Sequence, residues 1–319
     1  MDYAINPHHS TLHSQLMLWL NKPTLVKNSA KWLLLDASLI EQNDFMRLMK
    51  SQEYIFFHNV FSKSRFEVYG LYAPHLIRLE DAQTTTQAEF LKDLLNLSSG
   101  IPALAALDAC DEVTSLSDCL TWFAQAFTPD SLELYCRLAD TRITPGLLQV
   151  LDEEQKQMLG QNILQWQIVN RMGTLEALLP NIKAQLDDDP THFKKFSSSN
   201  AFSLSDAQFA ALMDKAEADQ IFQHLCANNP TLVPVSGRGV FHNRLETVVK
   251  RAHQYGLESH PDLLLFTVIA LNTHDRFDVH PVLKETWLKT KEQGASFSQT
   301  VSTWSDSVWN ELSQPPVLS

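Results

Sequence analysis

Patterns typical of β-strands stop partway along this chain, and this change constrains its architecture more than any other feature. The stretch 180–200 marks the change, because it holds two prolines, three consecutive aspartates and three consecutive serines. Such a composition is typical of an exposed connection between folded parts. The sequence therefore predicts a first lobe over 1–178, a linker over 179–200, a second lobe over 201–312 and a frayed tail over 313–319.

The first lobe is predicted to mix strands and helices. Residues 31–37 form a continuous apolar run, as in a buried strand, and 53–61 is rich in aromatic and β-branched residues. Side chains alternate over 65–72 and 132–138, which predicts two more strands. Helical spacing falls before and between these runs, at 10–20, 39–49, 88–97 and 115–127. These patterns predict an α/β or α+β lobe with a small mixed sheet.

The second lobe is predicted to be all-α. Ser205 and Gln208 have the spacing of a capping pair for a helix that runs to about 226. Helical spacing continues over 240–255, 260–272, 281–293 and 296–311. Trp309 lies off the apolar stripe of the last helix, so it is our candidate for an exposed aromatic residue at an interface.

Composition and charge exclude several classes of protein. The formal net charge is -12 and no cluster of Lys and Arg offsets it, so a nucleic-acid partner is not expected. The longest apolar run, 263–271, is far shorter than the roughly 20 residues of a membrane span, and the N-terminus lacks a signal-peptide pattern. The four cysteines form no C-x-x-C pair and are expected to be reduced. We therefore expect a cytoplasmic protein with no membrane partner.

Motifs for catalysis are sparse. The sequence has no phosphate-binding glycine motif and no G-x-S-x-G nucleophile motif. One enzymatic alternative rests on the adjacent His274 and Asp275, with His242 or His253 upstream and Asp306 downstream, in the manner of a helical metal-dependent phosphohydrolase. The pair lies in a polar segment typical of a helix end, which favours a structural role. We expect a protein that binds other proteins, with no catalytic residue, metal or cofactor.

Three segments of the first lobe resemble a known family. The opening strand ends in Leu-Leu-Asp-Ala at 34–37, a Tyr- and Pro-containing stretch covers 68–79, and an Arg-x-x-Asp-x-Arg signature lies within 136–143. Together they are similar to a domain of unknown function in type VI secretion effector chaperones, also called adaptor proteins. The resemblance extends over roughly 30–172, and the second lobe is only loosely similar to the helical extension of these chaperones.

The resemblance implies an adaptor that holds a secreted effector toxin in the cytoplasm and delivers it to the spike protein (VgrG type) of the secretion system. It marks a set of residues as structural or partner-contacting: Asp36, Tyr69, Tyr72, Pro74, Arg137, Asp140 and Arg142. A carboxylate between two guanidiniums would pin the chain where a strand leaves the sheet, and the same cluster is also suited to contact a partner. An immunity-type protein that masks a toxin is a third alternative.

Overall fold

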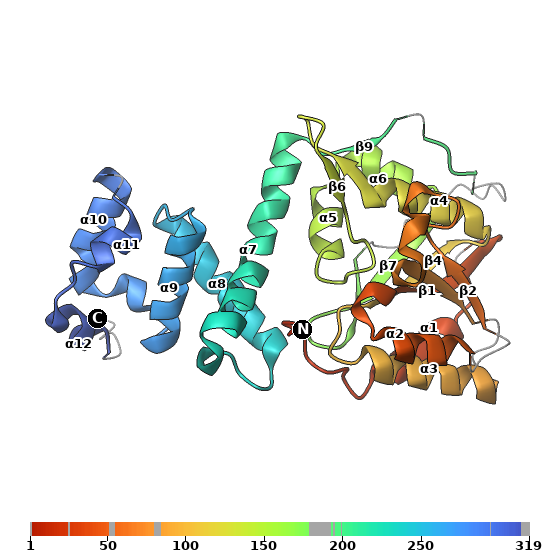
Figure 1. The fold of residues 1–319 in the computed structure, drawn as a ribbon, viewed down its shortest axis with the longest axis horizontal. Helices are drawn as coiled ribbons and strands as arrows, with labels where there is room; N and C mark the ends of the chain where they lie inside the picture. The colour runs from red at the N-terminus through yellow and green to blue at the C-terminus, as the bar shows by residue number, and fades with distance from the viewer. Residues whose placement is uncertain are drawn as a thin grey trace. The chain divides into compact units, whose positions relative to one another are not determined.

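In the computed structural model, the chain divides into two compact units, one over Ile5–Asp214 and one that joins Met1–Ala4 to Lys215–Ser319. The first unit combines sheets with helices and the second is helical, so the predicted fold class is confirmed (Figure 1). The structure describes residues 2–24, 26–50, 55–79, 84–178, 193, 195–198, 200–293 and 295–313. Most of the predicted linker and tail lie outside the described residues.

The first unit is built on a six-stranded sheet in which every neighbouring pair is antiparallel. Its strand order is β2-β3-β1-β4-β7-β8. The strands are β1 (Ser29–Asp36), β2 (Phe56–Asn59), β3 (Pro74–Arg78), β4 (Leu104–Cys110), β7 (Ile163–Val169) and β8 (Leu175–Ala177). β1 and β4 lie in the centre and are buried almost throughout, which explains the continuous apolar run over 31–37.

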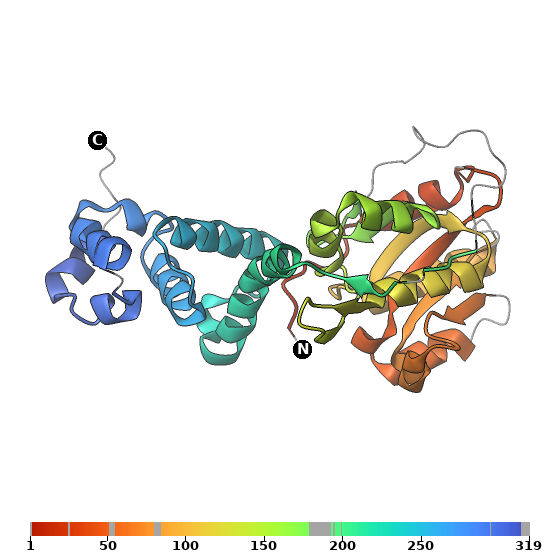
Figure 2. The ribbon, with the colours of Figure 1, turned by 90° about the horizontal axis from the view of Figure 1, so that it is seen from above.

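Helices cover both faces of this sheet, because alternate side chains of each strand point to opposite faces. Leu33 and Leu35 share a core with α1 (Leu12–Leu20), α2 (Gln42–Lys50) and α3 (Thr85–Ser98). Trp32 and Leu34 face the other core, which contains α4 (Val113–Ala124), α5 (Thr144–Val150) and α6 (Glu153–Gly160). The two helical layers are visible on either side of the sheet in Figures 1 and 2.

A second sheet of three strands adjoins the α4 side. It consists of β5 (Gln125–Phe127), β6 (Glu133–Tyr135) and β9 (Phe202–Ser203), in the order β6-β5-β9. β5 pairs with β6 antiparallel and with β9 parallel, so this is the small mixed sheet of the unit.

The boundary between the units differs from the predicted one. Residues 201–214 belong to the first unit, and the division falls after Asp214, within α7 (Asp206–Asn228). The physical reason is that Phe196 and Phe202 are buried in the core of the first unit, where both rings pack on Trp122. The predicted linker contains Phe196 and the predicted second lobe contains Phe202, so the composition of this stretch revealed neither aromatic anchor.

Two other element predictions are wrong. The alternating segment Arg65–Tyr72 is a 3-10 helix, because Ser64 caps its first turn and Gly70 takes a positive φ of 52°, which breaks an extended strand. The single helix predicted over 296–311 is divided into α11 (Phe297–Val301) and α12 (Asp306–Leu312). In addition, β4 and β7 had not been predicted.

The helical unit contains most of α7 with α8 (Arg238–Gln254), α9 (His260–Asn272), α10 (Lys284–Gln293), α11 and α12. The capping pair at the start of α7 is confirmed, since the Ser205 amide donates to Gln208 Oε1 and the Gln208 amide donates to Ser205 Oγ. A buried carboxylate, Asp278, accepts hydrogen bonds from Arg251 at 2.6 Å and from the Tyr255 hydroxyl at 3.2 Å.

Among the described residues, no helix combines the length and apolar character that crossing a membrane requires.

Lys31 is a buried cation at the centre of the first unit. Its side chain, only 8% exposed, donates to the carbonyls of Trp19 and Lys22 at the carboxyl end of α1. It lies opposite buried Asp108 in the β1–β4 register. Burial lowers the pKa of Lys31, and the charge of Asp108 opposes this shift. The positive charge of Lys31 therefore offsets both the negative charge of buried Asp108 and the partial negative charge at the carboxyl end of α1.

Replacing Lys31 should destabilise the first unit. We expect Lys31→Met to lower the free energy of unfolding by about 3 kcal/mol, because the carbonyls at the end of α1 would lose their donor and buried Asp108 a nearby positive charge. Urea unfolding followed by circular dichroism measures this change. The exposed Lys27→Met is the matched control and should change stability by less than about 0.5 kcal/mol. Equal effects of the two substitutions would contradict this account of Lys31.

Candidate partner-binding surface

The end of β1 is held by a charged contact from a distant part of the chain. Asp36 is 3% exposed and accepts hydrogen bonds from the Ser38 amide and hydroxyl, which fixes the turn after the strand. Its second carboxylate oxygen accepts from Arg137 Nη2 at 2.9 Å, and the same Nη2 donates to Ser38 Oγ at 2.8 Å. One guanidinium thus ties the strand end to the chain that follows β6.

A second carboxylate of the signature is completely buried. Asp140 has no exposed surface and receives two hydrogen bonds from the Arg142 side chain, from Nε at 3.0 Å and from Nη2 at 2.6 Å. Arg137 Nη1 approaches Asp140 less closely, at 3.9 Å. The two guanidiniums therefore do flank Asp140, as the sequence suggests, although the shorter contact of Arg137 is to Asp36. We call Asp36, Arg137, Asp140 and Arg142 the charge network.

Four aromatic rings form a cluster close to this network. Phe61, Phe66, Tyr69 and Tyr135 all contact one another, with ring centroids 5.2 to 6.3 Å apart. Phe61 and Phe66 are buried, whereas Tyr69 is 44% exposed and Tyr135 41% exposed. We call this cluster the tyrosine surface. It presents two half-exposed phenol rings on a rigid aromatic base.

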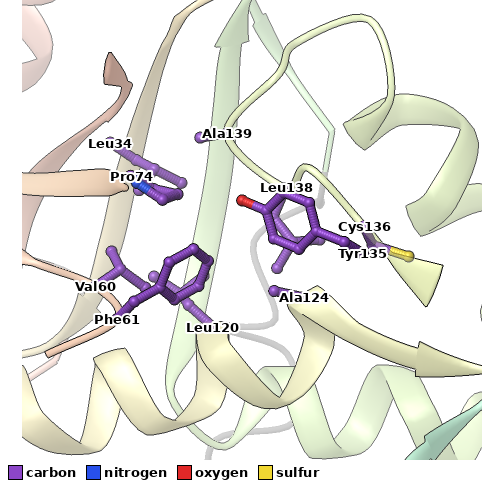
Figure 3. A pocket seen from close by; sticks show the side chains of 10 residues that line it. All are labelled: Leu34, Val60, Phe61, Pro74, Leu120, Ala124, Tyr135, Cys136, Leu138 and Ala139. Carbon is purple, nitrogen blue, oxygen red and sulfur yellow. The ribbon is translucent and has the colours of Figure 1, made fainter. Parts of the chain in front are cut away.

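Pro74 and Tyr135 bring the tyrosine surface and the charge network together. Pro74 begins β3 directly opposite Asp36 in the sheet register. Its ring and that of Tyr135 line one small apolar cavity, which also includes Phe61 (Figure 3). Burial raises the pKa of Tyr135 well above its ordinary value, and the nearby charge of Asp36 raises it further. Tyr135 therefore keeps its hydroxyl proton and offers a neutral donor beside a charged network.

The cavity itself is not suited to a small-molecule ligand. Its volume is about 10 Å³, which is the room of roughly one water molecule. Binding pockets for metabolites and cofactors usually measure 300 Å³ or more, by order of magnitude. What this region offers is its exposed aromatic surface.

A comparison with protein-family models finds a match within the first unit. Residues 31–158 match a family model described as a domain of unknown function (DUF4123). The DUF4123 match begins in β1 and ends in α6, so it includes the charge network and the tyrosine surface. It is shorter at its C-terminal end than the expected 30–172. The comparisons with curated proteins and with solved structures give no match.

Two of the predicted site residues belong neither to the charge network nor to the tyrosine surface. Tyr72 belongs to the DUF4123 region and is 53% exposed, but within the described residues its ring contacts no other ring. Trp309 is on the helical unit, where its ring packs edge-on against Trp304 at 5.0 Å and remains 37% exposed. Conversely, Tyr135 had not been selected, although the alternation over 132–138 placed it opposite the apolar face of Leu134.

The side chains predicted as metal ligands of a phosphohydrolase do not gather into a metal site in the part of the chain that the structure describes. Asp275 is ion-paired with Arg244 at 2.5 Å, in the turn that follows α9. His253 contacts Glu217 at 2.7 Å, and His242 lies 3.4 Å from Asp219, so each imidazole faces a carboxylate of α7. Among the described residues, no group of three or more His, Cys, Asp and Glu side chains could hold a metal ion.

Asp140, the fully buried carboxylate of the charge network, should contribute strongly to the stability of the first unit. We expect Asp140→Ala to lower the free energy of unfolding by about 3 kcal/mol, because the largely buried Arg142 guanidinium would lose both side-chain hydrogen bonds to this carboxylate. Arg137→Ala should cost less, about 1 to 2 kcal/mol, because buried Asp36 keeps its hydrogen bonds from Ser38 and water can reach the place of the 30% exposed Arg137 side chain. Chemical denaturation of the two variants beside the wild type tests this order. A smaller loss for Asp140→Ala than for Arg137→Ala would contradict it.

His75, which follows Pro74 in β3, should make stability depend on pH. Burial lowers its pKa from 6.5 to about 4, while the hydrogen bond that Nδ1 donates to the Ala73 carbonyl opposes the shift. The unfolded chain therefore binds a proton between pH 6.5 and 4 that the folded chain does not. Its contribution to stability is present above pH 6.5 and is lost as pH falls toward 4.

The measurement compares unfolding free energies at pH 7 and pH 5. His75 alone should account for a loss of about 2 kcal/mol over this range. His75→Gln should remove that part of the pH dependence, whereas His13→Gln at an exposed position should retain it. An unchanged pH slope in His75→Gln would show that the imidazole is not the group responsible.

Proposed function

We propose that this protein is an adaptor of a type VI secretion system that binds a secreted effector in the cytoplasm and assists its loading onto the spike protein. The DUF4123 match supports the proposal, because that family is associated with effector adaptors of these systems. In this proposal the chain acts by binding proteins and does not act as an enzyme. The tyrosine surface is its contact region for the effector.

The observation that carries the proposal is the exposure of Tyr69 and Tyr135 beside Arg137. Tyrosine, tryptophan and arginine are the residue types most enriched at the energetic centres of protein interfaces. Tyrosine has few rotatable bonds, so its burial against a partner costs little side-chain entropy. The rings are also held in place before binding, since Phe61 and Phe66 support them from the core.

The charge network supports the same role in a different way. It is electrically balanced, with two carboxylates and two guanidiniums, and three of its four side chains are at least 85% buried. Most of its hydrogen-bonding capacity is used inside the protein. It therefore serves to fix the surface, while the tyrosines and the exposed part of Arg137 supply the contacts.

Co-expression with the neighbouring genes tests the proposal. The chain should form a complex, stable in size-exclusion chromatography, with the full-length product of an adjacent effector gene, and should raise the soluble yield of that product. Deleting the chain should abolish secretion of the effector. If effector solubility and secretion are both unaffected, the proposed function is wrong.

Tyr69→Ala should weaken this complex. We expect a loss of at least about tenfold in affinity, measured by isothermal titration calorimetry, because a central interface tyrosine would be removed. Leu18→Ala is the matched control, since Leu18 is 66% exposed on α1, away from the aromatic rings of the cluster. Unfolding curves of both variants should stay close to that of the wild type. A similar affinity for the two variants would remove the tyrosine surface from the contact region.

A further inference from the structure

Strand β6 is an outer strand of the three-stranded sheet, and its free edge lies beside the tyrosine surface. β5 is its neighbour on one side, and no described strand pairs with the other side. Its residues Glu133 and Tyr135 point their side chains to the same face, because side chains alternate along a strand. On that face Tyr135 contacts Tyr69, and Glu133 forms an ion pair with Arg65.

The register shows which backbone groups of β6 point outward. The Cys136 amide donates to the Ala124 carbonyl at 2.8 Å, and the Thr128 amide donates to the Leu132 carbonyl at 3.0 Å. In an antiparallel pair the bonded positions alternate with positions whose N–H and C=O face away from the partner strand. Leu134 therefore bonds β5, whereas the amides and carbonyls of Glu133 and Tyr135 face the free edge.

These outward groups have no partner in the part of the chain that the structure describes. Neither the N–H nor the C=O of Glu133 or Tyr135 makes a hydrogen bond there. On each outer strand of the larger sheet, by contrast, a backbone group that points outward does have a hydrogen-bond partner. The Ser62 amide donates to the Asn59 carbonyl at the end of β2, and the Leu175 amide of β8 donates to Gln15 Oε1. An edge with unpaired groups is a ready template for another strand.

We propose that the partner binds by adding an extended strand to the free edge of β6. Its backbone would bond the outward amides and carbonyls of Glu133 and Tyr135, and a hydrophobic side chain opposite Tyr135 would pack on the tyrosine surface. The occupant is thus an extended protein segment with an apolar residue at that position. The identification of this segment as part of the effector rests on the proposed function above.

A substitution of Glu133 by proline tests the backbone edge of β6 separately from the side chains around it. Glu133→Pro removes one outward N–H and leaves the bonds between β5 and Leu134 in place, because proline is compatible with an edge position whose N–H faces solvent. Glu133→Ala is the matched control, since it also loses the ion pair with Arg65 but keeps the amide. Both variants are compared with the wild type in affinity for the full-length effector. Circular dichroism and thermal unfolding verify that they fold.

We expect Glu133→Pro to weaken binding at least about tenfold and Glu133→Ala less than about threefold. Equal affinities of the two variants would overturn strand addition and leave the adaptor function intact. Amide hydrogen exchange on the wild-type chain gives a second measurement that needs no variant. Binding should slow exchange at Glu133 and Tyr135, with the Leu134 amide as an internal reference that is protected throughout. Unchanged exchange at both positions would also overturn the inference.

A peptide probe separates this inference from the proposed function. If no effector complex forms, the adaptor function fails, and the edge is then tested with the peptide Lys-Thr-Val-Thr-Val-Thr-Val-Thr-Lys at millimolar concentration. Slower exchange at the two amides on addition of this peptide, and its loss in Glu133→Pro, would support strand addition by itself. No change with the peptide would overturn it.

Discussion

The contact between Arg137 and Asp36 joins two parts of the chain that are 101 residues apart, and the proposed binding surface depends on it. Asp36 ends the central strand β1, and Arg137 lies just after β6. The 2.9 Å hydrogen bond therefore fixes the small sheet against the large one. Arg142 and buried Asp140 complete the junction, so that its charges are balanced within the protein.

This junction explains why the exposed tyrosines are in a defined position. Tyr135 precedes Arg137 by two residues, and Tyr69 belongs to the 3-10 helix that leads into β3. With the end of β1 tied to the chain after β6, both tyrosines rest on Phe61 and Phe66. A surface held in place in this way loses little entropy when a partner binds. Beside this aromatic surface, the free edge of β6 presents the outward amides and carbonyls of Glu133 and Tyr135.

The helical unit shows the same principle with different residues. Asp278 is 4% exposed, and Arg251 and Tyr255 satisfy its carboxylate at the centre of the aromatic core. Trp287 donates to the Asp278 carbonyl and stacks on Tyr255 with a centroid distance of 4.2 Å. In both units a buried carboxylate with an arginine partner sets the position of the rings around it.

The sequence alone determined the fold class, most of the helices and the strands within 31–37, 53–61 and 132–138, because burial on a regular element leaves a pattern in the sequence. It also indicated Asp36, Arg137, Asp140 and Arg142 through a resemblance. Tertiary structure alone decided the rest. β4 is rich in alanine, which carries little strand preference, and it is a strand because β1 and β7 pair with it. Phe196 lies in the predicted linker and Phe202 in the predicted second lobe, yet both are buried in the core of the first unit, where their rings pack on Trp122. The pairing of Arg137 with Asp36, the exposure of Tyr135 and the open edge of β6 depend on contacts between distant segments, which no local pattern records.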